Sequence, residues 1–247
     1  MLPRSAIEAM REIALPKRFY LDQAVLLALS AVLLLWLFHA THIDLRLETP
    51  YYDAINRTFP WRYAWISKYF LHRYLKYALL VVGAAVWVVA LSTRFRAQPT
   101  RFLATHHRRW WFVAWCFVAV PITIGVLRRL SPMHCPWEIT EFGGHAPYFD
   151  LLSAAPAGIR AGHCFPTAFV ASGSWLLAFA LLWYPEHKLR SVTIGIAALL
   201  FSFALGWVQQ MRGAHFLSHT LWSLWVSWAV VLLVHFASGA WRERSPA

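Results

Sequence analysis

Arg212, His215 and His219 stand close together in a chain that is otherwise strongly apolar. Residues three or four positions apart share one face of an α-helix, so helical spacing would point these three side chains the same way, with Gln209 one turn earlier. Burying an arginine and two imidazoles together is costly without a functional role. The alternative is a polar patch where a helix meets the lipid headgroups.

Two other polar segments, 128–137 and 162–173, have the same character. Pro166 suits the first position of a helix, and the backbone N–H groups at a helix start, here those of Thr167 and Ala168, attract anions. Arginine binds phosphate oxygens in a bidentate manner, and an imidazole can act as a nucleophile or an acid. Together the three segments predict phosphate chemistry at a membrane surface.

The chain has 247 residues, of which 59% are hydrophobic and 15 are Trp, and its formal charge is +12. A soluble domain of this length would carry more charged side chains. The positive residues lie between apolar runs, so they indicate topology and contacts with anionic lipids, not a nucleic-acid surface. The sequence predicts an all-α polytopic membrane protein. Six transmembrane helices are expected at about 21–40, 74–92, 110–127, 166–184, 192–208 and 216–238.

Six spans place both termini on the same side of the membrane. The positive-inside rule assigns that side to the cytoplasm, because it also receives the basic loop after 92 and the basic link 186–190. The other side receives 41–72, whose aromatic residues predict an interfacial helix, and the long extracytoplasmic loop 128–165. We expect a cytoplasmic lead (1–20), one membrane domain (21–240) and a cytoplasmic tail (241–247).

The chain has three cysteines. Cys116 lies in the middle of a predicted span and is expected to be an inert packing residue. Cys135 and Cys164 both fall in the loop on the non-cytoplasmic side, where an oxidising compartment favours a disulfide between them; the alternative is two free thiols. Neither belongs to a C-x-x-C pair, so no metal site is predicted.

The order and spacing of these residues resemble the motifs of the type 2 phosphatidic acid phosphatase superfamily, six-span membrane lipid phosphatases and phosphotransferases. That family carries K-x6-R-P, P-S-G-H and S-R-x5-H-x3-D, which overlay 128–136, 166–169 and the segment 209–219. The tracts C-P-W-x4-F-G-G, G-H-C-F-P and R-G-A-H-F-L-S-H further resemble a bacterial branch of the superfamily. The likeness covers about residues 70–240 and implies a place in the bacterial inner membrane.

The resemblance implies a two-step reaction through a phosphohistidine. His215 matches the nucleophilic histidine, and His219 takes the place of the aspartate that orients it. The substrate would be a phospholipid or isoprenoid carrying phosphate or pyrophosphate, drawn from the outer leaflet, and neither a metal nor another cofactor is implied. The implied phosphate-binding residues are Arg128, Arg212, Gln209, Thr167 and Ala168.

Phe169 departs from the family pattern, because it stands where the family has its general-acid histidine. General acid catalysis contributes about 10²–10⁴-fold, and an apolar ring cannot supply it. Another imidazole could serve, His163 being the first candidate, or the substrate could dispense with the acid. A pyrophosphate releases a phosphate group with a pKa of about 6, whereas a lipid alkoxide resembles hydroxide, whose acid has a pKa of about 16. The third alternative is a protein that has lost hydrolysis and binds lipid phosphate as a scaffold or carrier.

An alternative interpretation from another enzyme class is a rhomboid-type intramembrane protease, which also has six spans. Ser172-Gly173 and the Ala214-His215 pair carry that likeness. Val170 replaces the first glycine of the G-x-S-G motif, however, so Ser172 is expected to be a small packing residue.

Overall fold

The computed structural model describes residues 15–95 and 107–238, and the secondary structure of this part is helical, without β-strands. The predicted all-α fold class is therefore confirmed. Five helices in the described residues are long and apolar enough to cross a bilayer. They are α2 (Lys17–Thr41), a π-helical turn (Ile66–Tyr74) continued by α4 (Leu75–Phe95), α6 (His107–Leu130), α9 (Lys188–Met211) and α10 (Leu217–Ala237).

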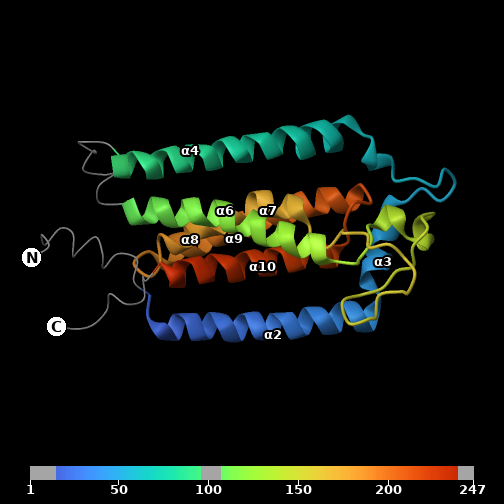
Figure 1. The fold of residues 1–247 in the computed structure, drawn as a ribbon, viewed down its shortest axis with the longest axis horizontal. Helices are drawn as coiled ribbons and strands as arrows, with labels where there is room; N and C mark the ends of the chain where they lie inside the picture. The colour runs from blue at the N-terminus through green and yellow to red at the C-terminus, as the bar shows by residue number, and fades with distance from the viewer. Residues whose placement is uncertain (1–14, 96–106, 239–247) are drawn as a thin grey trace, which may run out of the picture.

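The segment expected to form the fourth span is shorter and interrupted. It consists of α7 (Ala168–Ser174), a 3-10 turn (Trp175–Leu177) and α8 (Ala178–Leu181). Its position explains how a short segment fits here, because it lies among the other helices (Figure 1) and Trp175 at its centre is completely buried. Serine hydroxyls on its contact with α10 pair directly, Ser174 Oγ with Ser227 Oγ at 2.6 Å. Small and polar residues of this kind favour close helix contacts inside membranes.

The helices lie side by side, with α2 at one edge of the bundle and α4 at the other (Figure 1). Apolar side chains of α2 such as Leu29 and Val32 are each 65% exposed, which suits a surface in contact with lipid. In contrast α10 packs against α2, α6, α7 and α9 and carries six buried polar side chains.

The predicted interfacial segment 41–72 contains α3 (Ile43–Glu48) and 3-10 turns at Thr49–Tyr51 and Pro60–Arg62. The acidic side chains of α3 do not face the surroundings, since Asp44 and Glu48 are 1% and 0% exposed. Thus α3 packs against the protein at the end of the bundle where α9 passes into α10 (Figure 1).

Three sequence predictions lie wholly or largely outside the described residues. These are most of the cytoplasmic lead 1–20, the basic loop between α4 and α6, and the tail 241–247.

Candidate functional site

The turn between α9 and α10 carries Arg212 and His215 and is closely packed. Gly213 adopts a φ of +69°, a conformation that favours glycine, and a Cβ atom there would lie 2.4 Å from the Phe59 ring. A Cβ at Gly206 would lie 2.2 Å from the Thr220 side chain, so this glycine allows α9 and α10 to approach closely. The two glycines therefore bring the end of α9 and the start of α10 into one compact unit.

Other segments hold this turn in place. Asp44 of α3 accepts the backbone N–H of Ser218 in the first turn of α10 at 2.9 Å, so α3 supplies the cap that α10 lacks locally. Gln210 Nε2 donates to the Leu47 carbonyl at 3.2 Å, and Trp137 N–H donates to the Gly213 carbonyl at 3.0 Å. Burial raises the pKa of Asp44 to about 6. The carboxyl that caps α10 is therefore more readily protonated than an exposed one.

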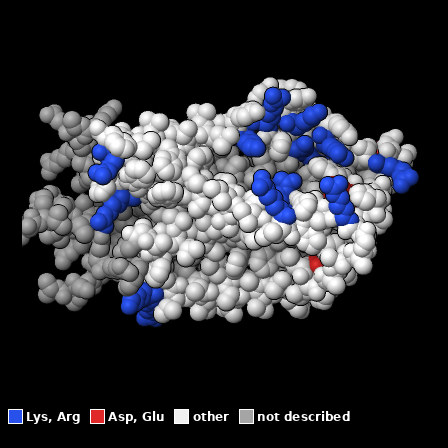
Figure 2. All heavy atoms as spheres, viewed as in Figure 1, with Lys and Arg blue, Asp and Glu red and all other residues white. Residues whose placement is uncertain are grey.

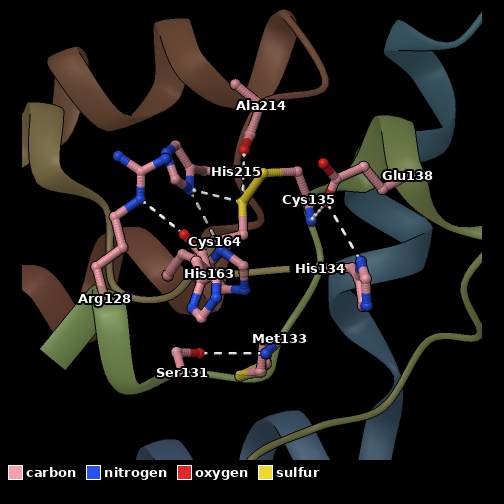
Figure 3. Close-up of a disulfide and its surroundings, with 11 residues drawn as sticks. Arg128, Ser131, Met133, His134, Cys135, Glu138, His163, Cys164, Ala214 and His215 are labelled. Atoms are coloured by element: carbon pink, nitrogen blue, oxygen red, sulfur yellow. Dashed lines mark hydrogen bonds and ion pairs between the residues drawn. A yellow bond between two sulfur atoms is a disulfide. The ribbon is translucent and has the colours of Figure 1, made fainter. Parts of the chain in front are cut away.

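A disulfide joins Cys135 to Cys164 and anchors the long loop beside the histidines (Figure 3). The Cys164 Sγ atom lies 3.4 Å from His215 Nδ1 and 3.1 Å from the Ala214 carbonyl oxygen. Since the sulfur is bonded to another sulfur, these are packing contacts and not S–H hydrogen bonds. The bridge thus forms part of the wall around His215.

Loss of this disulfide is expected to lower the free energy of unfolding by about 3 kcal/mol, because the bridge closes a loop over a sequence separation of 29. Thermal unfolding of the double variant Cys135→Ser/Cys164→Ser in detergent would measure this change. Cys116→Ala, at the buried free cysteine, is the matched control for loss of a sulfur elsewhere. Peptide mapping that finds both thiols free in the native protein would contradict the prediction.

His215 and His219 form a buried pair at the start of α10, with exposures of 6% and 0%. Their Nδ1 atoms lie 3.4 Å apart. Burial lowers the pKa of His215 well below its usual value, and the nearby His219, Arg128 and His72 lower it further. His215 is therefore neutral at neutral pH, as a nucleophilic imidazole must be. Its Nδ1 faces His219 and the disulfide, which leaves Nε2 as the nitrogen that can meet a substrate.

The proton between the two imidazoles can sit on either ring. If His215 Nδ1–H donates to His219, then His215 Nε2 carries a free lone pair and can attack phosphorus. If His219 donates instead, His215 carries its proton on Nε2 and cannot attack. A carboxylate has no proton to offer and would force the first arrangement. Among the described residues the buried His219 Nε2 has no hydrogen-bond partner, so none of them stabilises the reactive arrangement.

If the predicted phosphate chemistry proceeds through attack by His215, His219→Asp should increase the rate of that attack by about tenfold or more, since selecting the correct histidine tautomer has large effects in enzymes. Single-turnover kinetics on a lipid pyrophosphate would measure the change. His219→Asn is the matched control, because its amide N–H can still donate a hydrogen bond to His215 Nδ1. It should give no such increase in rate. An equal response to both substitutions would show that the tautomer does not limit the reaction.

Arg128 lies at the end of α6, and its side chain reaches the segment that carries His163 and Cys164 (Figure 3). Its Nε donates to the His163 carbonyl at 2.8 Å, which leaves its terminal nitrogens for another ligand. His163 has a φ of +52°, an uncommon conformation for a residue with a side chain. An open pocket of about 410 Å³ lies here, lined by Gly125, Arg128, Arg129, Gly162, His163 and Ala168. The structure thus brings three expected site residues, Arg128, His163 and Ala168, to one pocket.

Arg212 is 9% exposed and forms a second buried cationic group. Its Nη1 donates to Gln209 Oε1 at 2.9 Å, whereas its Nε is buried and has no hydrogen-bond partner among the described residues. Burial lowers the pKa of Arg212, and the nearby Arg62 lowers it further. Arg62 itself stacks on Trp137 at 4.1 Å. A buried arginine beside a second arginine favours an anionic ligand that would neutralise the pair.

Thr167 does not offer a free backbone N–H, contrary to expectation. Its N–H donates to Ser223 Oγ at 2.8 Å, and the residue is completely buried. The hydroxyl of Ser223, one turn after His219, was not visible as a partner in the sequence. Thr167 is the N-cap of α7, and Ala168, the first residue of the helix, lies at the pocket wall.

Phe169 packs into an apolar cluster with Leu79 and Leu205. The ring of His72, which precedes α4, lies 4.6 Å from the Phe169 ring, and His72 Nδ1 lies 3.2 Å from Gln209 Nε2. No local pattern in the sequence links His72 to a helix more than a hundred residues later, so its place beside Gln209 was not predicted.

Two alternatives can be compared with the geometry. Ser172, the serine of the protease reading, donates its hydroxyl to the Phe169 carbonyl of its own helix at 2.6 Å, as a packing residue does. Cys164, His215 and His219 each place a potential metal-ligand atom within 4.8 Å of the others. Metals bind the thiolate form of cysteine, and here the sulfur is part of a disulfide. The oxidised site therefore offers two imidazoles.

Among the described residues, basic side chains lie at both ends of the bundle, and on one face many of them lie near the site. Figure 2 shows Lys and Arg side chains clustered at the end that carries α3, with few acidic groups on this face. Such a surface raises the local concentration of anions.

Comparison of the chain with protein-family models, with curated proteins and with solved structures gives no match.

Proposed function

We propose that this protein is an integral membrane lipid phosphatase or phosphotransferase that acts on a phosphorylated or pyrophosphorylated lipid through a phosphohistidine. The observation that carries the proposal is the setting of His215. This buried imidazole, whose pKa is lowered by burial and by Arg128, lies three residues after the buried Arg212. Its order and spacing with these arginines resemble the type 2 phosphatidic acid phosphatases.

In this mechanism His215 Nε2 attacks phosphorus and the leaving group departs. Arg128 and Arg212 bind the equatorial oxygens, whose negative charge increases in the transition state. Water then releases phosphate from the histidine, or another acceptor takes it. The neutral state of His215 and the unpartnered Arg212 Nε support this assignment of roles.

The substrate is an anionic lipid that reaches the site from the bilayer. The pocket beside Arg128 is open, so a lipid headgroup can enter it. We place the protein in the bacterial inner membrane with both termini cytoplasmic and the loop 128–165 outside. The α7–α8 segment is the fourth of six crossings in chain order.

This topology predicts opposite accessibility for two exposed positions. A membrane-impermeant maleimide should label Ile55→Cys in intact cells, because Ile55 is 92% exposed at the site end. Lys188→Cys, at the start of α9, should react only after the cells are permeabilised. Both variants are compared in a Cys116→Ala background, and the reverse labelling pattern would contradict the topology.

Trapping of the covalent intermediate tests the function. Purified protein is mixed with an isoprenyl pyrophosphate labelled on its terminal phosphate and quenched in alkaline detergent. The expected result is label on the protein that is stable in alkali and lost in acid, as a phosphohistidine is, and absent from His215→Ala.

The second candidate function is a lipid-phosphate carrier or scaffold. Phe169 and His219 favour it, because neither supplies the group that the resembling enzymes use at that position. Retention of lipid phosphate without any label on the protein would support the carrier and overturn the enzyme.

A further inference from the structure

His72 belongs to the site although it lies far from the motifs in the sequence. His72 lies in the last turn of the π-helical segment before α4, and this turn brings it to the site. Its ring packs against Phe169 and its Nδ1 contacts Gln209, and it contributes to the electrostatic lowering of the His215 pKa. The His72 imidazole therefore contacts the second motif segment at Phe169 and the third at Gln209. It also interacts electrostatically with His215.

The hydrogen-bond chain from Arg212 fixes how His72 carries its proton. Arginine has only donors, so the Gln209 atom facing Arg212 Nη1 must be the carbonyl oxygen, Oε1. The Gln209 amide nitrogen, which has only donors, then faces His72 Nδ1 at 3.2 Å. Consequently His72 Nδ1 must accept. The ring is neutral, and its single N–H is on Nε2.

We propose that His72 Nε2–H donates a hydrogen bond to the leaving phosphate of a lipid pyrophosphate, with Gln209 as the positioning residue that fixes this tautomer. The proposal rests on the proposed function and names its substrate class. His72 serves as a neutral donor and not as an acid. It stabilises a leaving group that departs as an anion, whereas a lipid alkoxide would need a proton as well.

The step balances without a proton transfer to the leaving group. A bond forms between His215 Nε2 and the terminal phosphorus, and the bond from that phosphorus to the bridging oxygen breaks. The electron pair of the broken bond stays on the bridging oxygen, so a lipid monophosphate anion leaves, held by the His72 Nε2–H. The proton on His215 Nδ1 remains shared with His219.

The first test reads the tautomer directly and does not need turnover. Nitrogen NMR of the full chain, labelled on histidine and assigned with His72→Leu, should show His72 protonated on Nε2 and not on Nδ1. Addition of methylene bisphosphonate, a pyrophosphate analogue that cannot be cleaved, should shift the Nε2–H signal. Gln209→Glu should move a proton onto Nδ1, since a carboxylate cannot donate to it. A His72 protonated on Nδ1 in the wild type would overturn the proposal.

The second test separates the two chemical steps on farnesyl pyrophosphate. His72→Leu should slow formation of the phosphohistidine by about 10²-fold, the low end of what one hydrogen-bond donor to a developing anion contributes. It should leave the hydrolysis of the phosphohistidine unchanged, because the leaving group has gone by then. His72→Gln keeps an amide donor and should retain most of the rate. His187→Leu, at the opposite end of the bundle, is the control.

The outcomes are distinguishable from failure of the enzyme itself. Absence of a phosphohistidine in the wild type would contradict the proposed function. The NMR test would still determine the tautomer of His72 and its contact with the bisphosphonate. A normal rate of phosphohistidine formation in His72→Leu, or equal slowing of both steps, would remove His72 from the reaction.

Discussion

Replacement of His215 by alanine is expected to lower turnover of a lipid pyrophosphate by at least about 10³-fold, because removal of a nucleophile leaves only binding and electrostatic stabilisation. His215 is buried, has a pKa lowered by burial and by nearby groups that include Arg128, and lies in the turn that carries Arg212. Phosphate release from purified protein in detergent would measure the loss.

The comparison variant is His145→Ala, at a loop histidine next to His134 that has no part in the proposed mechanism. It should keep the wild-type rate. Binding of a lipid phosphate by His215→Ala, which retains both arginines, would show that the variant is folded. Wild-type turnover in a folded His215→Ala would refute the phosphohistidine mechanism.

The wild-type protein should cleave a lipid pyrophosphate at least about 100-fold faster than the matching lipid monophosphate. Phe169 cannot act as an acid, and an acid contributes about 10²–10⁴-fold where the leaving group needs one. Farnesyl pyrophosphate and farnesyl phosphate differ only in that group and make a matched pair of substrates for the measurement of kcat/KM.

Phe169→His should narrow this difference by raising monoester cleavage at least about tenfold, with less effect on the pyrophosphate. The side chain is buried against Leu79 and Leu205, so Phe169→Leu controls for loss of packing. If the wild type already cleaves the monoester rapidly, another acid is present, and His163→Ala should then remove it. An inert protein that does not respond to Phe169→His would favour the carrier.

The helical fold class and the approximate helix limits could be predicted, because apolar length is a local property of the chain. The length and continuity of the helix in 166–184 were harder to predict, since a helix surrounded by protein need not match the bilayer in length. The segment 41–72 was expected to hold an interfacial helix on the strength of its aromatic residues, but the capping of α10 by Asp44 was not predicted. That role depends on a contact between residues 174 positions apart, which no local pattern encodes.

The histidine pair at 215 and 219 was predictable, because spacing within one helix determines which side chains are neighbours. Engagement of the Thr167 N–H by Ser223 was not, because it depends on how α7 meets α10. His72 shows the same limit, since 137 positions separate it from Gln209. The motifs thus located the site, whereas the residues that complete it come from elsewhere in the fold.

The disulfide has a consequence for chelation. The Nδ1 atoms of His215 and His219, and His215 Nδ1 and Cys164 Sγ, are each separated by 3.4 Å. Neighbouring ligands of a tetrahedral zinc ion, with bonds of about 2.0–2.3 Å, have nearly that separation. A free thiolate at 164 would complete a three-ligand set and give zinc a means of occupying the His215 imidazole. Pairing with Cys135 removes that thiolate, so the disulfide leaves two of the three ligands and keeps the His215 imidazole out of a complete zinc site.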